Sequence, residues 1–374
     1  MKRILFICFL LGSMAANAQE QPGFLTDNAV SPIKNQQQTG TCWCFSTTSL
    51  LESQYLKDHK KQDIDISEMF TVRNTYLDKG RNYILRQGHA QFSEGGLGHD
   101  VIHTISRYGA VPESAYTGLT GGAKFFNHSK MAPRLQNYLD SILKLKKPLP
   151  DWEPGFNAIL DEYMGKAPAT FDYNGKQYNP KSFAAEVLHF NADDYVGFTS
   201  FTHHPYNQNF IVEVPDNFSN GSYYNVPLNE LIQISKEALK KGYTIMWDAD
   251  VSNRGFAFKN GYALAPKDEE AIKATPFNPD VAEKEVSPEY RQKLYEELIT
   301  QDDHLMHITG LAKDKSGKEY FVVKNSWGEQ AGPFKGYVYV SEPYFAVNTI
   351  TIVIPKSALP KSWLKKHPDV TTTL

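Results

Sequence analysis

The hydrophobic pattern of the chain predicts one β-hairpin and several helices. Residues 302–328, DDHLMHITGLAKDKSGKEYFVVKNSWG, place two runs of β-branched and aromatic residues on either side of a Lys-Asp-Lys-Ser-Gly turn, which predicts a hairpin. Helical spacing of apolar residues predicts helices over 131–145 and 156–164, separated by the Pro-rich stretch LKKPLPDWEPG. Another helix is predicted over 287–299, because Ser287 can cap it and Pro288 suits its first turn.

A further helix is predicted to begin at Cys42. Residues 31–50, SPIKNQQQTGTCWCFSTTSL, form a polar, Gly-containing segment that becomes apolar after Thr41. The free N–H groups and the dipole at a helix start favour a thiolate, so we expect the thiol pKa of Cys42 to fall from about 8.5 toward about 3.5–7.5. Cys42 is therefore a candidate nucleophile, and a buried structural thiol is the alternative.

The cysteines exclude several other kinds of site. Only Cys8, Cys42 and Cys44 occur, too few for a disulfide-stapled scaffold or a four-thiolate zinc site. Residues i and i+2 of a helix point to opposite sides, so Cys42 and Cys44 can neither bridge each other nor share a metal. We expect Cys44 to be a small core residue.

The predicted hairpin supplies partners for a nucleophilic cysteine. Such a thiol needs a base and a group that orients the base. His304 enters the first strand and Asn325 leaves the second, so antiparallel pairing brings their side chains to one end of the hairpin. His307 lies three residues on, hence on the opposite face, and is expected to be structural or exposed.

The N-terminus predicts export. Lys2 and Arg3 precede an apolar run over residues 4–11, and the small residues of MAANA follow at 14–18. We interpret residues 1–18 as a signal peptide and expect a periplasmic or extracellular bacterial protein with no membrane span. The net charge of -3 and the pI near 6.4 provide no basic field, so nucleic acid is not an expected partner.

Three motifs together resemble those of papain-like cysteine peptidases. They are NQQQTGTCWCFS, HLMHITG and KNSWG, and they occur in the order of that family. The resemblance implies an α+β papain-like fold, in which an N-terminal helical subdomain carries the catalytic helix and packs on an antiparallel, barrel-like β subdomain. It also implies peptide-bond hydrolysis without a cofactor.

The resemblance assigns a role to each matching residue. Cys42 would be the nucleophile and His304 the acid and base, while Asn325 would orient the imidazole and Gln36 would donate to the oxyanion. We therefore expect Cys42→Ala to abolish hydrolysis and Cys44→Ala to leave it largely intact.

Other matching residues would form the substrate cleft. Gly95 and Gly96, in SEGGLGHD, resemble the glycine pair that lines the cleft in this family. Trp327 would shield the His-Asn pair from water. Ser67 and Glu68 resemble the Ser-Glu pair that follows the catalytic helix.

The middle of the chain points to one branch of the family. The match covers about residues 30–116 and 240–355, and the extra segment between them resembles the bleomycin hydrolase and aminopeptidase C branch. We predict one peptidase domain over 19–374, with an insertion at about 117–240 that caps the cleft.

In the bleomycin hydrolase and aminopeptidase C branch, the C-terminal carboxylate meets the amino group of the substrate, but the tail KSWLKKHPDVTTTL departs from the usual ending of that branch. The arm before Cys42 is also shorter, so homo-oligomerisation is left open.

The expected function is that of an exported cysteine peptidase, with aminopeptidase action on peptides favoured. An endopeptidase or dipeptidyl-releasing enzyme and a catalytically inactive binding module are the alternatives. No third ligand is apparent beside His203 and His204, so this pair is interpreted as a loop or lid contact and no metal site is expected. Chelators would separate a metal-dependent hydrolase from a thiol enzyme.

Overall fold

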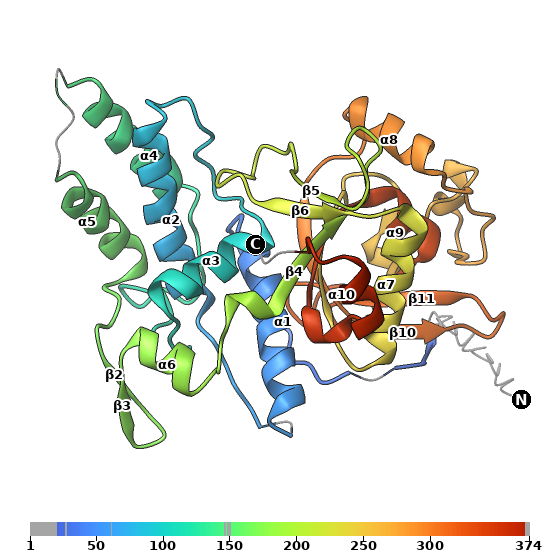
Figure 1. The fold of residues 1–374 in the computed structure, drawn as a ribbon, viewed down its shortest axis with the longest axis horizontal. Helices are drawn as coiled ribbons and strands as arrows, with labels where there is room; N and C mark the ends of the chain where they lie inside the picture. The colour runs from blue at the N-terminus through green and yellow to red at the C-terminus, as the bar shows by residue number, and fades with distance from the viewer. Residues whose placement is uncertain (1–20, 27, 61, 146, 148–150, 371–374) are drawn as a thin grey trace, which may run out of the picture.

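A group of helices and a large sheet with helices of its own lie on opposite sides of the central helix α1 (Cys42–Asp58) (Figure 1). The structure, a computed structural model, describes residues 21–26, 28–60, 62–145, 147 and 151–370, so the predicted signal peptide lies outside it. Most residues of α1 are buried, as expected for a helix enclosed on all sides. No helix within the described residues has the length and hydropathy needed to cross a membrane.

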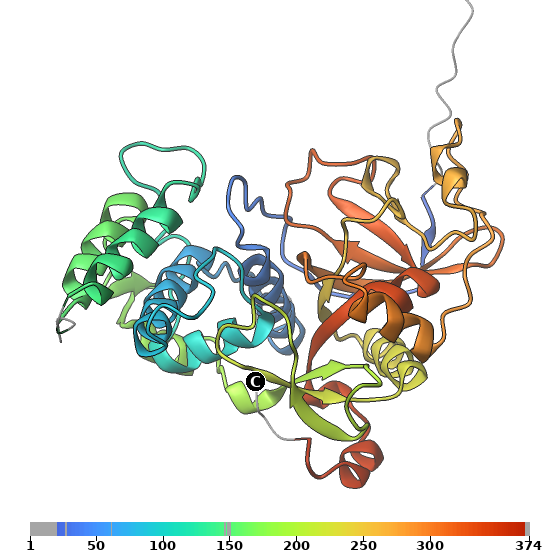
Figure 2. The ribbon, with the colours of Figure 1, turned by 90° about the horizontal axis from the view of Figure 1, so that it is seen from above.

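The helical side packs around α2 and α3. Its aromatic and aliphatic side chains form one core that also receives Met246 and Leu305 from the sheet. Figure 2 shows these helices grouped beside α1, away from the sheet. The elements of this side are α2 (Glu68–Leu85), α3 (Gly98–Tyr108), α4 (Met131–Leu143), α5 (Glu153–Met164), the hairpin β2 (Phe171–Tyr173) and β3 (Lys176–Tyr178), and α6 (Pro180–Glu186).

The other side is a mixed sheet with the order β5-β6-β4-β13-β7-β10-β11-β12-β9-β8, and β1 also pairs with β10. All of its pairs are antiparallel except β4 with β6 and β9 with β12. The strands are β1 (Gly23–Phe24), β4 (Tyr195–Thr199), β5 (Gln208–Ile211), β6 (Ser222–Asn225), β7 (Ile245–Ala249), β8 (Phe256–Ala257), β9 (Tyr262–Ala263), β10 (His304–Lys313), β11 (Glu319–Lys324), β12 (Tyr337–Ser341) and β13 (Thr349–Pro355).

The two faces of this sheet have different partners. Helix α1 packs against β10 and β7, whereas α7 (Leu228–Lys240) and α9 (Glu342–Asn348) contact the same sheet and share a second core with it. Successive side chains of strand β7 point to opposite faces of the sheet. Met246 belongs to the core around α1, and Trp247 belongs to the core around α7 and α9. Helices α8 (Pro288–Glu296) and α10 (Lys361–Lys366) complete the fold.

The local predictions from the sequence are confirmed. Helix α4 begins where predicted and ends two residues early at Leu143, α5 begins three residues early at Glu153, within the Pro-rich stretch, and α1 begins at Cys42. Helix α8 begins after Ser287, whose hydroxyl accepts a hydrogen bond from the N–H of Tyr290 at 3.1 Å. Strands β10 and β11 form the predicted hairpin.

The region interpreted as an insertion is divided between the two sides. Residues 117–186 supply α4 to α6 and pack on the helical side, whereas residues 195–225 supply β4 to β6 and extend the sheet. Strand β4 joins the sheet by pairing with β13. The inserted region therefore contributes to both sides of the molecule.

Candidate active site

The candidate nucleophile lies at the junction of the two sides. Cys42 is the first residue of α1 and is 8% exposed. The indole N–H of Trp43 donates to the carbonyl of Glu94 at 3.0 Å, which ties the start of the helix to the Gly95 segment. The backbone N–H of Leu305 lies within hydrogen-bonding reach of the Cys42 thiol, so the sulfur lies beside the residue that follows His304.

The candidate base is held in a defined tautomer. His304 Nε2 lies 2.8 Å from Oδ1 of Asn325, and that oxygen also accepts the N–H of Ser326 at 2.7 Å. Because Oδ1 is an acceptor, Nε2 must carry the proton, which leaves Nδ1 free to accept one. The ring of Trp327 stacks on the imidazole, with centroids 5.0 Å apart. Trp327 therefore packs against the imidazole of His304.

Gln36 is bound to the same loop. Its N–H donates to the carbonyl of Ser326 at 2.9 Å, and its Oε1 accepts from the Ser326 hydroxyl at 2.5 Å. Its Nε2 donates to the carbonyl of Thr39 at 2.7 Å, which uses one of its two amide hydrogens. The N–H of Cys42 has no intrahelical acceptor, since it opens the helix. Both groups thus remain potential oxyanion donors.

Both glycines lie close to side chains of other segments. A Cβ on Gly95 would lie 1.8 Å from Oδ2 of Asp216, so a larger residue there would have to displace this carboxylate, and one on Gly96 would lie 3.1 Å from the ring of Trp43, a tight contact. The buried ammonium of Lys79 donates to the carbonyl of Gly95 and to that of Ser93. The close approach of Asp216 therefore favours glycine at position 95.

The expected lowering of the thiol pKa is wrong for this arrangement. Burial raises the pKa of Cys42 to about 12, the nearby carboxyl groups of Asp302 and Asp248 add to the rise, and two backbone N–H groups oppose it. Burial also lowers the pKa of His304 to about 4. The prediction took account only of the effect of the helix start on the thiol pKa, whereas the residues that bury the thiol come from distant segments of the chain. The resting pair is therefore a neutral thiol and a neutral imidazole.

The structure places Cys44 and His307 away from this pair. Cys44 is buried and its thiol donates to the carbonyl of Glu68 at 3.3 Å, in keeping with a core residue. His307 is 1% exposed, so it is structural rather than exposed, and its Nδ1 lies 2.8 Å from the hydroxyl of Ser49.

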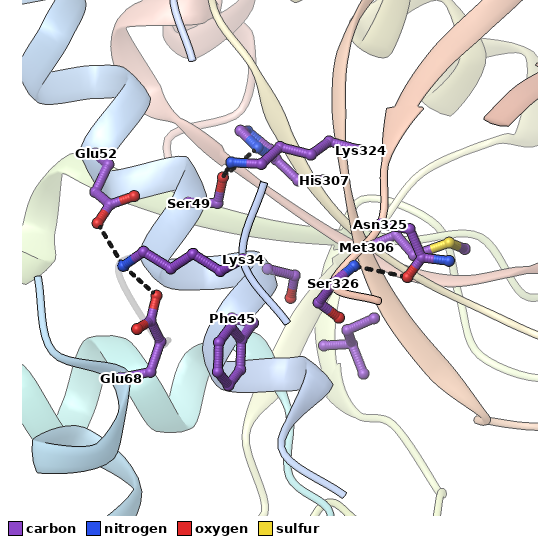
Figure 3. Close-up of a pocket in the computed structure, with 12 residues that line it drawn as sticks. Lys34, Phe45, Ser49, Glu52, Glu68, Met306, His307, Lys324, Asn325 and Ser326 are labelled. Atoms are coloured by element: carbon purple, nitrogen blue, oxygen red, sulfur yellow. Dashed lines mark hydrogen bonds and ion pairs between the residues drawn. The ribbon is translucent and has the colours of Figure 1, made fainter. Parts of the chain in front are cut away.

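A small polar cavity lies next to this region, beside α1 (Figure 3). Its volume is about 20 Å³, room for about one water molecule. The ammonium of Lys34 lies 3.1 Å from the carboxylate of Glu52 and 2.8 Å from that of Glu68. Nearby, Lys324 donates to the hydroxyl of Ser49 at 2.7 Å. We call Lys34, Glu52 and Glu68 the paired cluster.

The histidine pair has a partner that the sequence did not reveal. Glu213 lies 3.2 Å from Nε2 of His203 and 2.8 Å from that of His204, so the expectation that no third ligand lies near the pair is wrong. The antiparallel pairing of β5 with β6 and the turn before it fold Glu213 back, which residue spacing did not predict.

Two carboxyl groups near the candidate nucleophile were also missed. Asp248 lies in β7 and is fully buried, and Asp302, which is half-buried, lies two residues before His304. A signal existed, because IMWDA places an acidic residue inside an apolar strand, where a charge is costly without a partner.

Comparisons with known proteins give consistent matches. The model of the family described as "Peptidase C1-like family" matches residues 162–374, and that described as "Papain family cysteine protease" matches residues 23–138. The chain is 26% identical to Aminopeptidase G of Lactobacillus delbrueckii subsp. lactis, over 90% of this chain and 84% of the relative. It is 24% identical to Aminopeptidase C of Lactococcus lactis subsp. lactis, over 96% of this chain and 87% of the relative. The crystal structure of PepW from Lactobacillus rhamnosis shares the fold, with a TM-score of 0.72, 20% identity and coverage of 95% and 87% of the two chains.

Proposed function

This chain belongs to the Peptidase C1-like family, and we propose that it is an aminopeptidase that uses Cys42, His304 and Asn325 to remove residues from the N-termini of peptides. The predicted relationship to papain-like cysteine peptidases, on the aminopeptidase C branch, is confirmed, as is the α+β papain-like fold. The chain is accordingly a cysteine-type peptidase. The relatives named Aminopeptidase G and Aminopeptidase C support the exopeptidase assignment.

One observation carries the assignment of residues. The hydrogen bond of 2.8 Å between His304 and Asn325 leaves Nδ1 unprotonated, and the thiol of Cys42 lies beside Leu305, the next residue of the strand. A base needs an open lone pair and a position next to its nucleophile, and the tautomer of His304 together with its place next to Leu305 in the chain supports this assignment.

The reaction begins from the neutral pair. Substrate binding expels water, and the thiol proton of Cys42 moves to Nδ1 of His304, so that the thiolate and imidazolium stabilise each other while the net charge stays constant. The sulfur then attacks the carbonyl carbon, and the oxyanion accepts hydrogen bonds from Gln36 and the N–H of Cys42. Loss of one such donor typically lowers the rate by about a hundredfold or more.

The two later steps return the enzyme to its starting state. His304 gives its proton to the leaving amine as the C–N bond breaks, which leaves a thioester on Cys42. His304 then takes a proton from water, the hydroxide attacks the thioester, and the released thiolate recovers the proton from the imidazolium. Asn325 keeps the imidazole in the tautomer that each transfer needs.

Matched substrates test this function. The purified protein in reductant is given a dye-linked amino-acid amide with a free amino group and the same compound with an acetylated one, and iodoacetamide labelling is mapped by mass. We expect cleavage of the free amine alone, with the label on Cys42. Cys42→Ala should be inactive, whereas Cys44→Ala, the matched thiol control, should keep most of the activity.

Other outcomes would favour the alternatives. Cleavage of both substrates would indicate an endopeptidase, and release of two residues at a time a dipeptidyl-releasing enzyme. Absence of cleavage and of labelling would indicate a binding module. Equal loss of turnover in two well-folded Cys variants would contradict the choice of nucleophile.

Export is part of the proposal and rests on the first 18 residues. A positively charged start, an apolar run and an A-x-A pattern support removal of this segment at Gln19. N-terminal sequencing of the protein from the exported fraction of the native host should begin at Gln19. An intact Met1 in cytosolic protein would contradict it.

A further inference from the structure

A buried carboxyl group without a cation lies in the sheet beside the nucleophile. Asp248 is aligned with Leu305 of β10 on one side and with Thr351 of β13 on the other. Its side chain is 0% exposed, and its Oδ2 accepts a hydrogen bond from the Thr351 hydroxyl at 3.2 Å. Its Oδ1 receives no hydrogen bond from any group in the described part of the chain.

Asp302 faces the same point from the segment before β10. Its Oδ2 is also buried and receives no hydrogen bond from the described residues. The carboxyl groups of Asp248 and Asp302 lie close enough to share a proton, and burial followed by the charge of Asp216 raises the pKa of Asp302 to about 7. Asp248 is aligned with Leu305, the residue after His304, and Asp302 lies two residues before His304, so both carboxyl groups lie on the part of the sheet that carries the candidate base, and their charges raise the pKa of the Cys42 thiol.

The inserted region adds a third carboxylate. Asp216 follows β5, lies against Gly95, and accepts hydrogen bonds from the side chains of Gln91 at 2.5 Å and Ser93 at 3.0 Å. Its charge acts on both Asp248 and Asp302. The charge of Lys79 interacts with that of Asp216, but its hydrogen bonds go to the carbonyls of Ser93 and Gly95 rather than to a carboxylate. We call Asp216, Asp248 and Asp302 the unpaired cluster.

The position of this cluster fits the geometry of an exopeptidase substrate. In the first residue of a peptide, the α-nitrogen and the scissile carbonyl carbon are separated by two bonds of about 1.5 Å each. A group that binds this ammonium must therefore lie within a few ångströms of the attacking sulfur. Buried carboxylates without a cation are unfavourable alone, and an ammonium ligand would supply the missing charge and hydrogen bonds.

We propose that Asp248 and Asp302, assisted by Asp216, bind the α-ammonium of the first substrate residue and so confine cleavage to the N-terminal peptide bond. This inference rests on the proposed aminopeptidase function and names the residues that specify it. An acetylated N-terminus would place an uncharged amide against the carboxylates, with no charge to offset their burial.

The test separates substrate binding from turnover. Asp248→Asn and Asp302→Asn keep the side-chain volume, and Asp172→Asn, an exposed acid in β2, controls for the loss of one charge. For a dye-linked leucine amide with a free amino group, we expect KM to rise at least tenfold in the two cluster variants, with kcat within about threefold of wild type. The inhibition constant of the acetylated compound, measured against cleavage of the free amine, should stay constant or fall. An equal rise in KM and in this inhibition constant, or no rise in KM, would overturn the proposal.

A second measurement needs no turnover. Leucinamide should protect Cys42 of the wild-type protein from iodoacetamide, and acetyl-leucinamide should not. The protection should be lost in Asp248→Asn and kept in Asp172→Asn. Protection that persists in Asp248→Asn and Asp302→Asn would overturn the assignment even if these variants lose activity.

Further experiments test other origins of the preference for a free amino group. A chain that ends at Val370 should keep its preference for the free amine, and loss of the preference would transfer the role to the last four residues. Cleavage of acetyl-Arg-Leu-dye in preference to acetyl-Leu-Leu-dye, lost in Asp248→Asn, would show that the cluster binds a basic side chain and would also overturn the proposal. If the wild-type protein cleaves free and acetylated compounds equally, the proposed function fails. If it prefers the free amine and the variants keep this preference, only the inference fails.

Discussion

The paired cluster and the unpaired cluster bury carboxyl groups in opposite ways. In the paired cluster, Lys34 contacts Glu52 and Glu68 within 3.1 Å, and its Nζ also lies 2.7 Å from Asp65. In the unpaired cluster, Asp248 and Asp302 have only each other and Thr351 as close polar partners among the described groups. In the first arrangement a cation contacts the carboxylates, although Oε2 of Glu52 has no partner among the described groups, whereas no cation of the described residues contacts Asp248 or Asp302.

This difference distinguishes a cluster whose charges are paired within the protein from a cluster that we propose to bind a charged substrate group. Burial disfavours the ammonium of Lys34, but the carboxyl groups of Glu68 and Glu52 outweigh it and hold the pKa of Lys34 well above its ordinary value. Burial raises the pKa of Glu68, and the charge and hydrogen bond of the Lys34 ammonium oppose that rise. The unpaired cluster has no such compensation, which is typical of sites that a ligand completes.

Removing the cation of the paired cluster should have the largest effect on stability. Lys34→Met leaves Glu52 and Glu68 buried without a counter-ion, and we expect the free energy of unfolding to fall by about 3–5 kcal/mol. Urea unfolding followed by fluorescence measures it, with the exposed Lys144→Met as the control. A loss below about 1 kcal/mol would mean that the paired cluster is not needed for folding.

Removing a charged group from the unpaired cluster should raise the free energy of unfolding, whereas removing Lys34 from the paired cluster should lower it. Because the pKa of Asp248 is raised in the fold by burial and then by Asp302, the neutral form favours folding at low pH, and this contribution is lost as pH rises through the folded value. Asp248→Asn avoids that loss, so we expect it to raise the free energy of unfolding by about 1–3 kcal/mol at pH 8 and by little at pH 4. Urea unfolding at both pH values measures this effect. A lower free energy of unfolding for Asp248→Asn at pH 8 would contradict the predicted difference between the two clusters.

The smallest effect is expected beside the paired cluster, at Ser49. Its hydroxyl contacts Lys324 at 2.7 Å and His307 at 2.8 Å, but Lys324 also donates to the carbonyl of Ser31 at 2.8 Å. Ser49→Ala should therefore lower the free energy of unfolding by only about 1 kcal/mol. Thermal unfolding compared with Ser141→Ala, on the exposed face of α4, measures it. A loss near that of Lys34→Met would show that the two sets of charges act as one unit.

The sequence predicted those elements that depend on the local pattern of residues. Alternation and a turn predicted the hairpin that brings His304 and Asn325 together, and a change from polar to apolar residues located the start of α1 at Cys42. Apolar spacing also located α4 and α5.

What the sequence did not predict depends on contacts between distant segments. The thiol pKa follows from burial by both sides of the molecule, which no helix-start argument contains. Asp248 and Asp302 meet because β7 and β10 pair in one register, although 54 residues separate them in sequence. Glu213 reaches the two histidines only through the chain reversal around β5.

The packing of α1 on β10 has a consequence for the order in which the protein is made. The proposed nucleophile, Cys42, is synthesised 262 residues before the proposed base, His304. During that part of its synthesis, the growing chain carries the thiol without the strand against which α1 packs. Contacts between segments so far apart also make folding slow. If the proposed assignment holds, a chain that is still being made cannot cut peptides until the hairpin that carries His304 has been added.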